Sequence, residues 1–144
     1  MGNQRSIHVG DTLGPFEYTI TEEMADIYLA AIDSSEHWLK NHSADGRRWV
    51  PPCFTVRDYV YLLLQKKAWG IGGIHTKQES EFFNPAYVGQ RLVCRGKVTE
   101  ENFRKAKKYT VIEYQIDAAD GMPIAKHRFT GLVFQKKDHN DARA

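Results

Sequence analysis

The apolar residues of this chain change their spacing once, close to residue 70, and this change limits the fold more than any single motif. Before it, positions 56, 59, 60, 63 and 64 are apolar, which predicts an amphipathic helix that follows Pro51 and Pro52 and ends near Gly70. After it, apolar and polar residues alternate with a period of two, which is typical of strands. The pattern therefore predicts an α+β fold.

Four strands are expected in the second half of the chain. Their predicted ranges are 79–83, 91–98, 110–116 and 124–134. Asn84-Pro85 ends the first of these runs, and Asp120-Gly121 forms a tight turn before the last. Short connections of this kind favour an antiparallel sheet, and we expect that sheet to lie around the predicted helix.

The first half begins with a predicted strand over 16–20 and a helix that starts after Thr21. Thr21 offers a capping hydroxyl, and Glu22 and Glu23 place carboxylates where the helix dipole favours them. Apolar residues at positions 24, 27, 28 and 31 predict one apolar stripe on this helix, which ends near Ile32. The stretch 36–52 that follows is the longest irregular one, and loops of such length are often functional.

Composition narrows the function classes. The 144 residues fit one domain, and a net charge of +2 lacks the dense basic face of most nucleic-acid binders. The sequence shows no apolar run long enough to span a membrane and no secretory signal, so we expect a cytoplasmic protein with neither nucleic acid nor membrane as partner. Cys53 and Cys94 both lie among apolar residues, and we expect two reduced thiols in the core.

Several sequence pieces, taken in order, resemble one family. They are VGDTLGPFEYTIT, YLAAIDSSEHW, PPCFT and GGIHTKQESEFFNPAYVGQRLVCRGKV, and they span residues 7–135, with 136–144 as a polar tail. Together they are similar to MaoC-like and fatty-acid-synthase-type (R)-3-hydroxyacyl dehydratases, which have the hot-dog fold. The resemblance implies a single hot-dog domain, a dimer, and an acyl-CoA or acyl-carrier-protein thioester as substrate, with no cofactor.

The catalytic residues of that family do not align with matching residues here. Its motif resembles G-D-x-N-P-x-H, and an ungapped comparison places the Asp on Ser34 and the His on Leu39. The glycine whose N–H polarises the thioester carbonyl falls on the segment 51–53, where two prolines lack that N–H. The chain thus resembles the non-catalytic subunits of heteromeric dehydratases, whose partner supplies the Asp/His dyad.

The sequence is also compatible with two other functions. Asp33 and His37 are four residues apart, so they could form an acid/base pair in a self-sufficient hydratase or thioesterase. The more ordinary interpretation is that Asp33 caps the helix end and His37 is partly exposed. A non-enzymatic homodimer that binds an acyl thioester is the other alternative.

The predicted binding residues fall into two groups. The residues expected to contact the acyl chain are Phe54, Tyr59, His75, Phe82, Phe83, Pro85 and Val88. For His75 a purely hydrogen-bonded role competes with this one. Four cations, Arg104, Lys105, Lys107 and Lys108, form a hairpin tip that could meet the phosphates of CoA or an acidic carrier protein, or could be a solvated turn.

His127 and a group of three polar residues are further candidates for a functional role. His127 lies on an apolar strand face, where we expect a hydrogen-bonded core histidine. His37, His42 and Asp45 match no zinc spacing, so no metal is expected.

Overall fold

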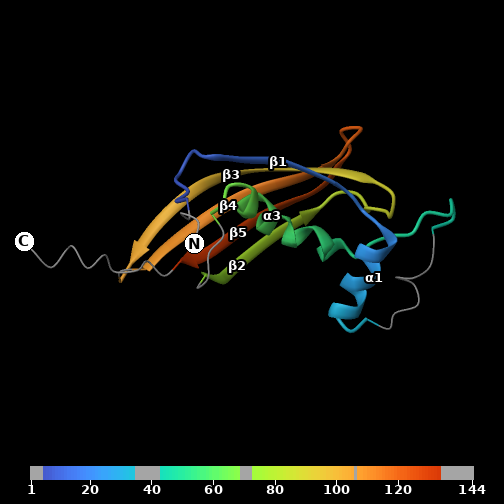
Figure 1. Cartoon of the computed structure of the whole chain (residues 1–144), viewed down its shortest axis with the longest axis horizontal. Coiled ribbons are helices and arrows are strands. Elements are labelled where there is room, and N and C mark those ends of the chain that lie inside the picture. The colour runs from blue at the N-terminus through green and yellow to red at the C-terminus, as the bar shows by residue number, and fades with distance from the viewer. Residues whose placement is uncertain (1–4, 35–42, 69–72, 106, 134–144) are drawn as a thin grey trace, which may run out of the picture.

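The computed structural model describes residues 5–34, 43–68, 73–105 and 107–133 as one antiparallel sheet with helices against one face and one end (Figure 1). The five strands lie in the order β1-β3-β4-β5-β2. Their bounds are β1 Thr12–Thr19, β2 Gly73–Phe82, β3 Arg91–Arg104, β4 Lys107–Ala118 and β5 Pro123–Val133. The predicted α+β class and the hot-dog arrangement are confirmed.

Four of the five described strands, β1 to β4, are longer than the alternation of apolar residues predicted. The strand β2 begins at Gly73, six residues before the predicted start, because it is the edge strand: nine of its ten residues are exposed, so no inward face marks them. The strand β3 continues to Arg104, which lies opposite Lys107 of β4 in the antiparallel register. In both places backbone hydrogen bonds extend the ladder beyond the apolar residues.

The predicted second helix is divided in two. Its first part is the 3-10 helix η1 (Pro52–Arg57), and its second is the α-helix α3 (Asp58–Gln65). The helix α3 contacts β1 and β3 and buries one side only, since Leu64 is 51% exposed while Leu62 is fully buried. A Cβ on Gly96 of β3 would lie 2.8 Å from the Leu62 side chain, so glycine allows this close approach.

The first helix, α1 (Glu22–Ala31), begins where predicted and lies beyond one end of the sheet (Figure 1). The Thr21 hydroxyl accepts a hydrogen bond from the Met24 N–H at 3.1 Å. The predicted apolar stripe is wrong in part, because Ile27 is 59% exposed and the buried residues are Ala25 and Leu29. The helix is thus rotated relative to the predicted stripe.

The two cysteines differ in burial. Cys94 of β3 is buried, as expected, and its burial raises the pKa of the thiol. Cys53 is exposed, so the prediction of a second core thiol is wrong. It lies in η1, whose buried residues are Phe54 and Thr55, so Cys53 faces away from the core. No helix within the described ranges has the length and apolar character to cross a bilayer.

Candidate functional site

A pocket of about 290 Å³ lies where the end of β2 meets the segment before η1. It is lined by Trp49, Val50, Pro51, Pro52, Thr55, Phe82, Phe83, Asn84, Pro85, Ala86 and Ile124. Three of the residues predicted to contact the acyl chain, Phe82, Phe83 and Pro85, are therefore brought together. The volume is at the lower end of the range for small-molecule sites.

Backbone hydrogen bonds hold the walls of the pocket in place. The Val50 N–H donates to the Ala86 carbonyl at 3.0 Å, and a short antiparallel bridge joins Trp49 to Tyr87. On the other wall the Phe83 N–H donates to the carbonyl of Ile124 at 2.9 Å. These bonds fix two loop segments that lie more than 30 positions apart in the sequence.

The one hydroxyl of the described pocket lining belongs to Thr55, which is joined by hydrogen bonds to His127 and Ser80. The Thr55 Oγ1 lies 2.9 Å from the Nε2 of His127, and the Nδ1 of His127 lies 2.8 Å from the Oγ of Ser80. Burial lowers the pKa of His127 to about 4, so the ring is neutral at neutral pH. The prediction of a hydrogen-bonded core histidine at this position is confirmed.

The lining residues within the described ranges include neither a carboxylate nor a histidine. The pocket can therefore enclose an apolar group and offer it one hydroxyl. An acid/base reaction in this pocket needs groups from elsewhere.

Phe54 and Val88 do not line the pocket. Phe54 is fully buried, with the ring of Tyr28 edge-on at 5.4 Å and the guanidinium of Arg57 at 4.1 Å from its ring centre. Val88 packs partly buried against the core. Both side chains pack in the core of this chain, and their contact with an acyl chain stays a prediction.

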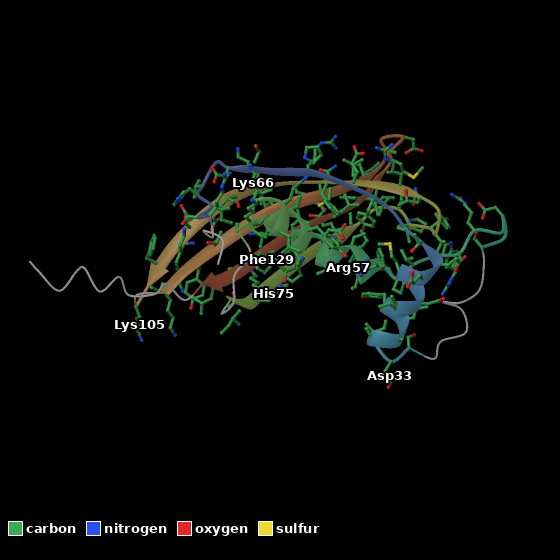
Figure 2. All side chains as sticks on the ribbon, in the orientation of Figure 1. Asp33, Arg57, Lys66, His75, Lys105 and Phe129 are labelled. Carbon is green, nitrogen blue, oxygen red and sulfur yellow. The ribbon has the colours of Figure 1, made fainter. Side chains whose placement is uncertain are left out.

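Tyr59 and His75 belong to a separate aromatic cluster with Phe129. The rings of Tyr59 and Phe129 stack at 4.1 Å, and the His75 ring stands edge-on to Phe129 at 4.7 Å. The hydroxyl of Tyr59 lies 3.3 Å from the Nδ1 of His75. Figure 2 shows His75 and Phe129 close together over the sheet. The structure thus agrees with the hydrogen-bonded alternative for His75.

Asp33 and Ser34 follow the end of α1. The backbone of Asp33 is left-handed, with φ of 51°, and its N–H donates to the Ala30 carbonyl at 3.1 Å. Asp33 is exposed, and its backbone takes part in the helix termination. His37 and Leu39 lie outside the described residues, so the acid/base pair of Asp33 and His37 stays a prediction.

The four predicted phosphate-binding cations form a hairpin tip between β3 and β4, but they are not equivalent. Arg104 lies opposite Lys107 in the strand register, and the backbone of Lys105 is left-handed, with φ of 49°. Lys108 is only 12% exposed, because its ammonium forms an ion pair with Glu101 and donates to the Ile7 carbonyl at 3.2 Å. The charge of Lys108 is therefore already paired within the chain, and its contact with a phosphate stays a prediction.

The hairpin tip lies far from the pocket of its own chain. Figure 2 places Lys105 at one end of the molecule and Asp33 at the other, with Arg57 between them and nearer to Asp33. Arg57 is two residues from the pocket residue Thr55. The remaining phosphate contacts stay a prediction.

A buried carboxyl group at Asp58 was not predicted from the sequence. The hydroxyl of Tyr18 donates to its Oδ2 at 2.9 Å, and its Oδ1 has no partner among the described residues. Burial raises the pKa of Asp58 to about 7. The sequence did indicate this burial, because Asp58 lies four positions before Leu62 and so shares the buried side of the helix.

The described residues contain no cluster of three potential metal ligands. Asp45 is bonded instead to its neighbours Ser43 and Arg47, with the Arg47 Nε at 2.7 Å. His37 and His42, the other two candidate metal ligands, lie outside the described residues.

Comparison with known proteins gives matches in structure only. No family model matches the sequence, and no curated protein matches it. An (R)-hydratase from A. caviae involved in PHA biosynthesis superposes with a TM-score of 0.72 at 18% identity, over 90% of this chain and 98% of that one. The HadBC (3R)-hydroxyacyl-ACP dehydratase complex from Mycobacterium tuberculosis gives 0.73 at 17% identity, over 90% and 98%.

A second complex from the same organism, ChsH1-ChsH2, gives a TM-score of 0.67 at 13% identity, over 90% of this chain and 100% of that one. At these identities the likeness concerns the fold. The predicted resemblance is confirmed at that level: this chain has the hot-dog fold that MaoC-like dehydratases and (R)-hydratases share.

Proposed function

We propose that this chain binds the acyl group of a CoA or carrier-protein thioester in the pocket between Trp49 and Phe82. It does so as one subunit of an (R)-specific enoyl-thioester hydratase or 3-hydroxyacyl-thioester dehydratase. A second hot-dog subunit supplies the Asp/His dyad. The observation that carries the proposal is an apolar pocket whose described lining has no acid or base.

Two structural features support a partner subunit. The edge strand β2 pairs with β5 on one side, and its exposed residues include Ile74 and Phe82. An exposed edge with large apolar residues is a ready place for another chain. Among the structural neighbours, HadBC and ChsH1-ChsH2 are complexes, which supports the same arrangement here.

The test is the affinity of the purified chain for hexanoyl-CoA, measured by isothermal titration calorimetry. Phe83 lines the pocket and is 49% exposed, so Phe83→Ala removes a ligand contact with little loss of core packing. We expect its Kd to rise roughly five- to tenfold, from the loss of about 1 kcal/mol of apolar contact.

Phe103→Ala is the matched control, because this phenylalanine is 66% exposed on β3, one residue from the distant hairpin tip. It should bind hexanoyl-CoA like the wild type. Equal effects of the two substitutions, or no binding by the wild type, would contradict the proposal. A homodimer that binds without any partner, or turnover by the chain alone, would point to one of the two alternative functions.

A further inference from the structure

Thr55 is the one hydroxyl among the described residues that line the pocket, and several of the polar groups around it are already bonded. The side-chain amide of Asn84 donates to the Pro123 carbonyl at 2.8 Å. The N–H groups of Val50 and Phe83 are used in the walls, and the two prolines have none. Trp49 and Asn84 also carry N–H groups at the pocket, but both residues are exposed, whereas Thr55 is 2% exposed. The buried donor for an acceptor oxygen of a ligand is therefore the Thr55 hydroxyl.

The contacts of Gln78 on β2 favour one direction for the hydrogen bonds behind Thr55. Its Nε2 lies 3.2 Å from the hydroxyl of Tyr114, 3.3 Å from the Oγ of Ser80 and 3.4 Å from the Glu79 carbonyl. The Tyr114 hydroxyl donates to the Val56 carbonyl at 2.6 Å, so towards Gln78 it accepts. An amide nitrogen is the group that suits these acceptors, and Ser80 Oγ receives a hydrogen from it.

Ser80 keeps its own hydrogen, and we assign it to the Nδ1 of His127, which lies 2.8 Å from the Ser80 Oγ. Residues Ser80 and His127 are direct partners across β2 and β5, so this contact is set by the sheet register. A neutral imidazole carries one hydrogen, which then lies on Nε2 and is donated to Thr55 Oγ1. The hydrogen of Thr55 is left for the pocket.

We propose that this oriented Thr55 hydroxyl donates a hydrogen bond to an oxygen of the bound acyl group, and that it makes the pocket select oxygenated acyl groups over plain alkyl chains. His127 and Ser80 act through Thr55 as positioning residues. The inference rests on the proposed function and adds the specificity-determining residue. The acceptor is the thioester carbonyl or a 3-hydroxyl, and both offer the same chemistry.

Three CoA ligands distinguish these two acceptors by calorimetry. They are S-hexyl-CoA, a thioether without acyl oxygen, hexanoyl-CoA, and (R)-3-hydroxyhexanoyl-CoA. If Thr55 contacts the carbonyl, hexanoyl-CoA binds roughly 3- to 10-fold more tightly than the thioether; if it contacts the hydroxyl, the added affinity appears only with the third ligand. Equal affinity for all three overturns the inference and leaves the proposed function intact, whereas no binding at all contradicts the proposed function and this inference with it.

Two variants of Thr55 make the assignment residue-specific. Thr55→Val keeps the shape and removes the hydroxyl, so the preference for the oxygenated ligand should disappear. Thr55→Ser keeps the hydroxyl and should keep the preference. Ser80→Ala removes the acceptor partner of Gln78 and the donor to His127, and should reduce the preference without changing the pocket wall. If the Val and Ser variants behave alike, the inference is wrong.

The protonation of His127 can be measured on the wild-type protein, so this test does not depend on the folding of a variant. The ring nitrogens of His127 report their protonation in long-range ¹H–¹⁵N NMR spectra. We expect the hydrogen on Nε2, in the free protein and with hexanoyl-CoA bound. A hydrogen on Nδ1 would reverse the row of hydrogen bonds, turn the Thr55 hydroxyl away from the pocket and overturn the inference.

Discussion

The buried carboxyl group of Asp58 should make the chain less stable as the pH rises. It lies in α3, which contacts β1 and β3, with Tyr18 of β1, Cys94 of β3 and Tyr114 of β4 as its titratable neighbours and Arg57 as the cation that acts on it. Burial disfavours the ionised form, and the hydrogen bond from Tyr18 and the charge of Arg57 only partly offset this. The substitution Asp58→Asn removes the titration and keeps an oxygen for the Tyr18 hydroxyl.

The size of the effect follows from the pKa of Asp58, which is 3.8 in an ordinary setting and about 7 here. The folded state holds this proton more tightly than the unfolded chain, so stability falls as the pH rises between these two values and the loss is complete above the higher one. A shift of about 3 units corresponds to about 4 kcal/mol in all, of which about 2 to 3 kcal/mol falls between pH 5 and pH 8.

Urea denaturation of the wild type and of Asp58→Asn at pH 5 and pH 8 measures this change. The stability of the variant relative to the wild type should rise by about 2 to 3 kcal/mol between the two pH values. Taking this difference removes the contribution of other groups such as His127. The control Asp120→Asn alters an exposed aspartate in a turn and should show no such rise. A constant difference for Asp58→Asn would refute the account of its burial.

Two further substitutions test the packing. Gly96→Ala places a Cβ 2.8 Å from Leu62 and should cost about 1 to 3 kcal/mol in urea denaturation, whereas Gly73→Ala, with its nearest contact at 3.7 Å, should change stability by less than about 0.5 kcal/mol; equal losses would contradict this close approach. Arg48→Met removes ion pairs to two exposed carboxylates of α1, one of them Asp26, and should lower stability by about 1 kcal/mol, less in 1 M salt. A loss above about 3 kcal/mol, independent of salt, would show that this arginine acts through packing.

The sequence predicted the fold well where one face of an element is buried. The strands β3, β4 and β5 alternate because the helices cover one side of them, and Thr21 marked the start of α1 by its capping hydroxyl. The pattern failed at the edge strand β2, whose two faces are both exposed. It also misplaced the apolar stripe of α1, because the sequence does not show which neighbouring element a helix will contact.

The candidate site was predictable only in part. Phe82, Phe83 and Pro85 were named because the resemblance implied an acyl site there, and they do line the pocket, where the strand ends at an Asn-Pro break. Thr55 and His127 were not linked, since they are 72 positions apart and meet only through the packing of η1 on β5. Contacts of this kind depend on sheet register, which the sequence alone does not fix.

The most direct test of the central claim is hydration of trans-2-hexenoyl-CoA by the purified chain alone, followed as loss of the enoyl absorbance. Binding of the same ligand is measured by calorimetry on the same preparation. A subunit that holds the acyl group but lacks its own dyad should bind the ligand and leave the absorbance unchanged. Steady turnover by the chain alone, abolished in His37→Ala, would contradict the claim and identify Asp33 and His37 as a working pair.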